Sequence, residues 1–507
     1  MANTTWTANV GTLCLTILIL IVLQLVFTLW KLFRQRQSHR IALAAFPCPP
    51  ARHWFYGHHW NTSAEQGIQD QLSLGKLYSH YYQRWVGPFR GTLSLIHPDS
   101  VKAILSTAEP KSPNSYGVLK EWLGDGLLIS SGAKWKRNRR LLTPAFHFDI
   151  LKPYVKVYND CVEVLMDKWC KGDLDKPVEL FKDVSLLTLD SLLKCIFSVE
   201  SNCQTDSGHN EYVRSVKQLA LLFIFRYRTF LPSFLFRRLV SHGRQWAETL
   251  DILHGYTKQV IDQKRNNRKK EQATEKTYVD FLDILLDAKD EDGDGLTDKE
   301  IQDEVDTFMF RGHDTTASGI SWCLYNLARY PEYQQKCREE IDELVEGKDN
   351  KEIEWEDLHC LNYTTMFIKE SLRFHPPVSN ISRRTTTPLH FPDGKVLPAG
   401  FSVAIFILGV HHNPHVWDDP EVFDPMRFSS ENSKNRTPYA FIPFAAGPRN
   451  CIGQNFAMNE LKVVISRILH RFELSIDNSC PTPKRRFGFV LRAENGIYIK
   501  LKPRSSF

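Results

Sequence analysis

The hydrophobic pattern separates one N-terminal segment from the rest of the chain. Val10–Trp30 is 21 residues long and contains no charged residue. As a helix it would be about 30 Å long, which is the thickness of a bilayer core. Further along, apolar residues recur at helical spacing in residues 300–328 and again just after Gly453. The pattern therefore predicts one transmembrane helix near the N-terminus and two long helices inside the domain that follows.

Basic residues lie on only one side of the apolar segment, where Lys31, Arg34, Arg36 and Arg40 follow it. The positive-inside rule then places residues 1–9 in the lumen as a short tail and the main domain in the cytoplasm. A cleaved signal peptide is the alternative, but the basic n-region that it needs is missing. We expect an anchor over 10–30, a basic and Pro-rich linker over 31–50, and one domain over 51–507, where no long linker or internal repeat occurs.

Composition narrows the choice of partners and compartment. The net charge of +6 is modest for 507 residues and no basic block with interleaved aromatics occurs, so nucleic acid is not expected as a partner. The eleven cysteines form no CxxC pair, which argues against a disulfide framework or a zinc site. Reduced thiols facing cytosol are the better interpretation.

One cysteine lies in a segment with unusual chemistry. Cys451 is flanked by Gly447 and Gly453, whose missing side chains let backbone N–H groups approach the sulfur. A helix that begins near Gly453 would direct its N-terminal dipole at a thiolate. Arg449 keeps its charge and suits a carboxylate. A buried, inert cysteine is the alternative, but a thiolate ligand of iron is the favoured interpretation.

The helix predicted over 300–328 contains Arg311-Gly312-His313-Asp314-Thr315-Thr316. A glycine inside a helix costs about 1 kcal/mol, which suggests that Gly312 opens room for a ligand. Asp314 and Thr315 could pass protons to that ligand. A threonine bonded to its own helix backbone is the alternative.

Three further stretches have candidate roles. Trp135 and Arg139 are four residues apart and share a helix face suited to an anion. Residues 219–236 combine aromatics with arginines, as a membrane-interface segment does, although ordinary core fits equally well. Asp290, Asp292, Asp294 and Gly295 resemble a calcium loop whose twelfth position, Ile301, lacks the required glutamate, so residues 290–295 are called the acidic loop.

The order Phe444, Gly447, Arg449, Cys451, Gly453 resembles the haem-binding loop of the cytochrome P-450 superfamily. Gln454 and Phe456-Ala457 resemble its microsomal family four, with the B-type subfamily as the suggested branch. The resemblance implies the cytochrome P-450 fold, mainly α with a small β region, around haem b. It implies the following roles: iron ligand for Cys451, haem-binding loop for Phe444 and Gly453, propionate contacts for Trp135, Arg139, Arg383 and Arg449, pocket wall for Val378, and a structural triad of Glu370, Arg373 and Arg427.

The same resemblance implies a monooxygenase of the endoplasmic reticulum membrane that hydroxylates fatty acids at or near the terminal carbon. The chain has no GxGxxG or P-loop pattern, so electrons from NADPH would come through a partner reductase, with cytochrome b5 as a second donor. Oxidation or epoxidation of xenobiotics and small aromatics is the alternative activity. The candidate docking charges for the donor are Lys136, Arg137, Arg140, Lys434, Arg436 and Lys462.

Arg311 departs from the resemblance, because family four commonly carries a glutamate there that esterifies a haem methyl group. An arginine cannot form that ester, so we expect non-covalent haem and a loosened preference for the terminal carbon. An unpaired buried guanidinium is also costly. A lipid-binding protein with little turnover is therefore a further alternative.

Overall fold

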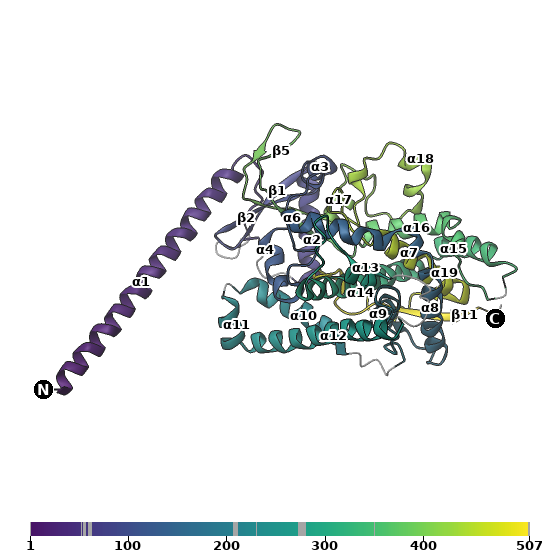
Figure 1. The fold of residues 1–507 in the computed structure, drawn as a ribbon. Helices are drawn as coiled ribbons and strands as arrows, with labels where there is room; N and C mark the ends of the chain where they lie inside the picture. The colour runs from purple at the N-terminus through teal and green to yellow at the C-terminus, as the bar shows by residue number, and fades with distance from the viewer. Residues whose placement is uncertain are drawn as a thin grey trace.

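The computed structural model describes residues 2–51, 53, 57–58, 63–205, 211–229, 231–271, 280–348 and 350–504. Helices dominate and several small sheets accompany them, as predicted. The first helix, α1 (Ala2–Leu43), projects away from the remaining elements, which pack together (Figure 1). Its segment Leu15–Leu43 is long and apolar enough to cross a membrane, with a mean hydropathy of 2.3 in its most apolar part and none of that part buried.

The end of α1 is attached to the main domain. The helix continues unbroken through the basic residues that were expected to form a linker, and it ends at Leu43, which is buried. His39 is hydrogen-bonded through Nδ1 to the backbone of Gly91, and the side-chain amide of Gln83 donates to the carbonyl of Leu43. Of the linker expected over 31–50, only the residues after Leu43 are therefore non-helical. The helix that contains the apolar segment leads directly into the packed domain.

The helices of the main domain surround α14, which lies at its centre (Figure 1). The helices are α2 (Ala64–Leu77), α3 (Pro98–Leu105), α4 (Pro113–Tyr116), α5 (Lys120–Leu123), α6 (Gly132–Leu142), α7 (Phe148–Leu151), α8 (Tyr154–Cys170), α9 (Leu180–Phe197), α10 (Glu211–Arg228), α11 (Ser233–Leu239), α12 (Ser241–Glu271), α13 (Phe281–Asp287), α14 (Asp298–Arg329), α15 (Pro331–Val345), α16 (Asn362–Phe374), α17 (Ile407–His411), α18 (Ser430–Ser433) and α19 (Gln454–Arg471).

The largest sheet has the strand order β1-β2-β7-β4, in which only the β2–β7 pair is parallel. Its register places Arg383 of β4 opposite Val403 of β7. The strands are β1 (Tyr81–Val86), β2 (Arg90–Leu95), β3 (Val178–Glu179), β4 (Ile381–Arg384), β5 (Leu389–His390), β6 (Val396–Leu397), β7 (Ser402–Ile405), β8 (Phe472–Ser475), β9 (Arg485–Arg486), β10 (Arg492–Ala493) and β11 (Tyr498–Pro503).

Both long helices predicted inside the domain are present. Thr297 and Glu300 form a reciprocal capping box that satisfies the first N–H groups of α14. Helix α19 begins at Gln454, directly after its N-cap residue Gly453. Most of α14 is buried, including Asp303, Glu304 and Asp306, so this central helix carries polar groups that need partners inside the protein.

Candidate active site

The loop before α19 holds Cys451 in a fixed backbone conformation. Gly447 has a φ of +72°, and a Cβ there would lie 1.8 Å from the carbonyl oxygen of Leu105. Only glycine can occupy such a position. The N–H of Cys451 donates to the carbonyl of Phe444 at 2.9 Å, and the N–H of Asn450 donates to the carbonyl of Gly447 at 3.1 Å. These bonds close the loop so that Cys451 stands immediately before α19.

Cys451 contacts an internal cavity, where its side chain is accessible while protein surrounds it. This burial raises the pKa of the thiol, and the nearby cation of Arg311, the N–H of Gly453, and the cations of Arg139 and Lys111 oppose the rise. The N–H of Gly453 agrees with the predicted approach of backbone donors to the sulfur, whereas the sequence did not predict that these three cations would favour a thiolate. A metal cation bound at the sulfur would supply the remaining stabilisation.

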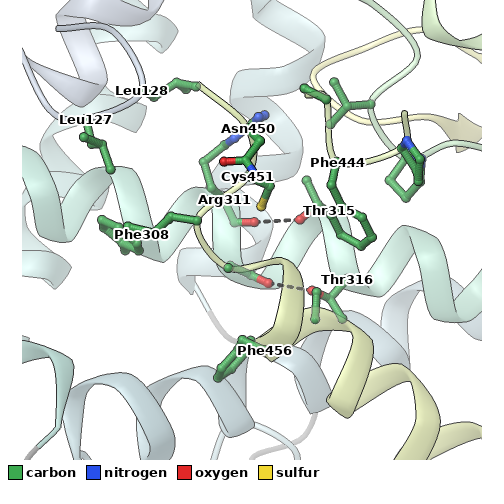
Figure 2. Close-up of a pocket in the computed structure, with 18 of the residues that line it drawn as sticks. Leu127, Leu128, Phe308, Arg311, Thr315, Thr316, Phe444, Asn450, Cys451 and Phe456 are labelled. Atoms are coloured by element: carbon green, nitrogen blue, oxygen red, sulfur yellow. Dashed lines mark hydrogen bonds between the residues drawn. The ribbon is translucent and has the colours of Figure 1, made fainter. Parts of the chain in front are cut away.

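Helix α14 forms the opposite wall of this cavity, which Figure 2 shows in close-up. Arg311, Gly312, Thr315 and Thr316 line it, and the sulfur of Cys451 belongs to the same cavity lining. The Thr315 hydroxyl donates to the carbonyl of Arg311 at 2.6 Å. Thr315 is thus bonded to its own helix backbone, which was the alternative to a role in proton transfer. Its side chain nevertheless remains at the cavity wall. The other walls are largely apolar and include Leu127, Leu128, Phe308, Val378, Ile381 and Phe444.

The structure separates Asp314 from Thr315. Asp314 is buried and does not belong to the residues that line the cavity. Its carboxylate accepts a hydrogen bond from Arg492 of β10 at 2.5 Å. One residue of helix rotation turns Asp314 toward β10, while Thr315 stays at the cavity wall. Proton relay by this pair stays a prediction, in which Asp314 would act from behind Thr315.

Gly312 also has a packing role that the sequence did not predict. A Cβ at this position would lie 2.4 Å from Cδ1 of Leu192 on α9. The two helices make close contact here, and the hydroxyl of Thr188 on α9 donates to the carbonyl of His313 at 3.0 Å. The missing side chain therefore permits the approach of α9 as well as leaving space in the cavity.

Two buried arginines near the cavity have N–H groups without partners among the described residues. They are Nε and Nη1 of Arg449 and Nε and Nη2 of Arg383. Burial and the neighbouring charge of Arg383 lower the pKa of Arg449 to about 10. Its guanidinium lies 4.4 Å from the centroid of the Trp135 ring. Unsatisfied buried cations of this kind call for anions, and the two propionates of haem are anions of the right class.

Arg139 also lines the cavity, and its guanidinium is hydrogen-bonded to the loop that carries Cys451. Its two terminal nitrogens donate to the carbonyl and side-chain oxygen of Asn450, at 2.8 and 2.9 Å. Arg139 thereby connects α6 to the residue before Cys451. The residues predicted for haem binding thus come together from α6, β4 and the cysteine loop, and their chemistry fits the group.

Sequence reasoning missed Lys111. This lysine lines the cavity, and it reaches it because it forms a β-bridge with Arg383, which lies far along the chain. Burial and the charges of Arg383, Arg311 and Arg449 hold the pKa of Lys111 well below its usual value, while Cys451 opposes this shift. A nearby anion would favour the charged form of Lys111, so this amino group is a further partner suited to a propionate. Its isolated position in a Pro-rich stretch offered no signal of this role.

The predicted structural triad is assembled as expected. Nε and Nη2 of Arg373 donate to the two oxygens of Glu370 at 2.7 and 2.8 Å, and both side chains are fully buried. Nε of Arg427 lies 3.7 Å from Oε1 of Glu370. The triad lies outside the cavity lining, which agrees with a structural role.

Comparison with known proteins gives the family. The family model described as "Cytochrome P450" matches residues 47–501. "Leukotriene-B4 omega-hydroxylase 3" of Mus musculus is 47% identical over 92% of this chain and 90% of its own length. "Cytochrome P450 4F4" of Rattus norvegicus is 46% identical over 95% and 94%, and "Ultra-long-chain fatty acid omega-hydroxylase" of Homo sapiens is 45% identical over 91% and 89%. Family four is thereby confirmed, with the F-type branch in place of the B-type. The chain belongs to the cytochrome P450 family of haem-dependent monooxygenases.

Proposed function

We propose that this monooxygenase hydroxylates fatty acids at or near the terminal carbon. The observation that carries the proposal is the character of the cavity. Its walls are mainly apolar, and its charged lining residues among those described are all cationic: Lys111, Arg139, Arg311 and Arg449. An apolar cavity without carboxylates accepts an alkyl chain and does not repel an acid. Two of the relatives named above are omega-hydroxylases, which favours this activity over xenobiotic oxidation.

Different residues of the chain would bind the haem, transfer protons and hold the substrate. A thiolate-ligated haem supplies O–O cleavage, with electrons that come from NADPH through a reductase. Cys451 would ligate the iron, while Lys111, Arg383 and Arg449 would neutralise the propionates. Thr315 holds a hydroxyl at the cavity wall for proton transfer, and Asp314 lies behind it in its ion pair with Arg492. Val378 and Phe308 exclude water and hold the alkyl chain.

The test is a product analysis. The full chain, reconstituted with a cytochrome P450 reductase and NADPH, is expected to convert laurate to 12-hydroxylaurate and 11-hydroxylaurate, measured by mass spectrometry. A small-aromatic substrate such as ethylbenzene serves as the comparison and should react more slowly. Substrate binding without any hydroxylated product would instead show a lipid-binding protein. Faster oxidation of the aromatic compound would favour the xenobiotic alternative.

Haem is bound non-covalently in this proposal, because Arg311 has no carboxylate with which to form an ester. The guanidinium of Arg311 lines the cavity close enough to Cys451 to lower the pKa of that thiol. We expect extraction with acidic organic solvent to remove all haem from the wild-type protein. Haem that stays with the wild-type polypeptide would contradict this assignment.

A matched pair of variants sharpens the extraction experiment. Arg311→Glu restores a carboxylate, whereas Arg311→Gln removes the same positive charge without adding one. After incubation with NADPH and reductase, part of the haem should remain with Arg311→Glu and none with Arg311→Gln. The same two variants should show whether the ratio of terminal to near-terminal product rises when the ester forms.

The membrane location is a further part of the proposal. Helix α1 would cross the endoplasmic reticulum membrane with its N-terminus lumenal, because the basic residues follow the apolar segment. The exposed side chains of Phe225, Phe234 and Leu239 on α10 and α11 provide a second apolar surface. Arg237 and Arg238 border it, as at a membrane interface. A lipophilic substrate could then enter from the bilayer.

Electron donors would dock on exposed cations. Lys136 and Lys434 are exposed. Lys462 instead donates to the carbonyl of Leu358 at 2.7 Å, and Arg436 lies over the Trp417 ring and donates to backbone carbonyls. These two are therefore less available than the sequence suggested. Reductase and cytochrome b5 would share the face that contains α6.

A further inference from the structure

Helix α6 connects the outside of the protein to the Cys451 loop. Its inner face contains Trp135 and Asn138, both buried, and Arg139, which bonds to Asn450. Its outer face contains Lys136, Arg137 and Arg140, three cations suited to an acidic electron donor. A protein docked on this outer face would therefore be one helix away from the residue that precedes Cys451.

The acidic loop, residues 290–295, already occupies part of that outer face. Arg137 Nε donates to Asp290 Oδ2 at 2.6 Å, and its Nη2 donates to the carbonyls of Asp294 and Gly295 at 3.2 and 3.0 Å. Arg140 forms an ion pair with Glu291. Among the cations of the outer face only Lys136 takes part in none of the ion pairs recorded for the described residues.

The loop has a defined shape that presents its charges outward. Asp290 Oδ1 accepts hydrogen bonds from the N–H groups of Asp292 and Asp294, at 3.1 and 2.9 Å. Gly293 supplies the turn with a φ of +84°. Asp290 is turned inward to Arg137, whereas Glu291 and Asp292 are exposed. Arg137 thus fixes the loop in place, and the loop then carries Glu291 to Arg140.

The two contacts differ in how easily they can open. The side chains of Arg137 and Asp290 are 23% and 13% exposed, and several bonds hold them. Those of Arg140 and Glu291 are 55% and 80% exposed and form a single ion pair. Exposed pairs are weak and are screened by salt. A carboxylate from another protein could therefore replace Glu291 on Arg140 without unfolding the loop.

We infer that the acidic loop is a built-in competitor of the electron donor, with Glu291 occupying Arg140 until an acidic reductase surface displaces it. The inference rests on the reductase partnership in the proposed function. It predicts that removal of Glu291 strengthens docking, because Arg140 then becomes available without an exchange of partners. The exposed Arg140–Glu291 pair should make reductase docking roughly twofold to fivefold weaker than it would be with Arg140 unpaired.

The chain offers a matched control for this test. Glu291→Gln and Asp292→Asn each remove one negative charge from an exposed side chain of the same loop, but only Glu291 pairs with Arg140. The dissociation constant of the full-length holoenzyme for a cytochrome P450 reductase would be measured in detergent micelles at low and at physiological salt. Glu291→Gln should lower it about twofold to fivefold at low salt, Asp292→Asn should lower it less, and the difference should shrink as salt rises.

A third variant tests whether Glu291 affects docking through Arg140. In an Arg140→Gln background, which itself should weaken docking, Glu291→Gln should have no more effect than Asp292→Asn. Equal effects of the two loop variants in the wild-type background would overturn the inference, as would unchanged docking of Arg140→Gln. Those outcomes are read from binding, so they are distinguishable from a failure to hydroxylate laurate, which would concern the proposed function alone.

Discussion

Replacement of Cys451 by alanine should abolish the red-shifted absorption that the reduced, carbon monoxide-bound protein owes to sulfur ligation. Alanine supplies no ligand to iron, and haem would then be held only through its propionates and apolar contacts. Electron donation by a thiolate favours O–O cleavage, so NADPH-dependent hydroxylation should fall by about a thousandfold or more. Absorption spectra and laurate turnover measure the two effects.

The control for this variant is Cys360→Ala. Cys360 is an exposed cysteine outside the cavity, so its replacement should leave both the spectrum and the turnover unchanged. All ten cysteines whose side chains the structure describes are unpaired, Cys360 and Cys451 among them, so neither variant breaks a disulfide. Persistence of the red-shifted band in Cys451→Ala would mean that another residue ligates the iron, and the site as described would be wrong.

Glu370→Gln should give a large loss of stability although it keeps the shape of the side chain. The variant leaves Arg373 buried with carbonyl partners but without its counter-charge. The backbone N–H of Asp424 also donates to Oε1 of Glu370 at 2.9 Å. Breaking a buried ion pair by removing one partner costs about 3–5 kcal/mol. Urea unfolding of the detergent-solubilised protein, followed by circular dichroism, should show a clearly lower midpoint.

An exposed pair with the same spacing provides the comparison. Asp173 and Lys176 are three residues apart, as Glu370 and Arg373 are, and their atoms lie 2.8 Å apart at the surface. Asp173→Asn removes the same charge from a solvated pair and should leave the midpoint unchanged. Equal midpoints for Glu370→Gln and Asp173→Asn would show that burial does not make the Glu370–Arg373 pair important.

Much of the site was predictable because its signals are local. The glycines around Cys451 predict a backbone that no other residue could adopt, and the φ of Gly447 and its closeness to Leu105 confirm this for Gly447. The start of α19 at Gln454 follows from the apolar spacing after Gly453. Glu370 and Arg373 are three residues apart on one helix, so their pairing needed only α16 to form.

Other features depended on contacts that no local pattern contains. Asp314 lies on the side of α14 that faces β10, where Arg492 pairs with it. The basic linker expected after residue 30 is helical to Leu43, since His39 and Leu43 have partners in the main domain. The sequence predicts Arg137 and Arg140 as surface charges for docking, yet the acidic loop pairs with both.

The sequence alone determined the apolar segment that predicts a membrane anchor, the two long helices, the cysteine loop and the chemical class of the protein, because hydrophobic spacing, glycine positions and a short ordered motif act within a few residues. Tertiary structure alone decided that Lys111 joins the cavity and that the acidic loop covers α6. Both result from segments far apart in the chain that pack or pair as the domain folds. Such contacts follow from the packing of the whole domain, and the spacing of residues along the chain does not predict them.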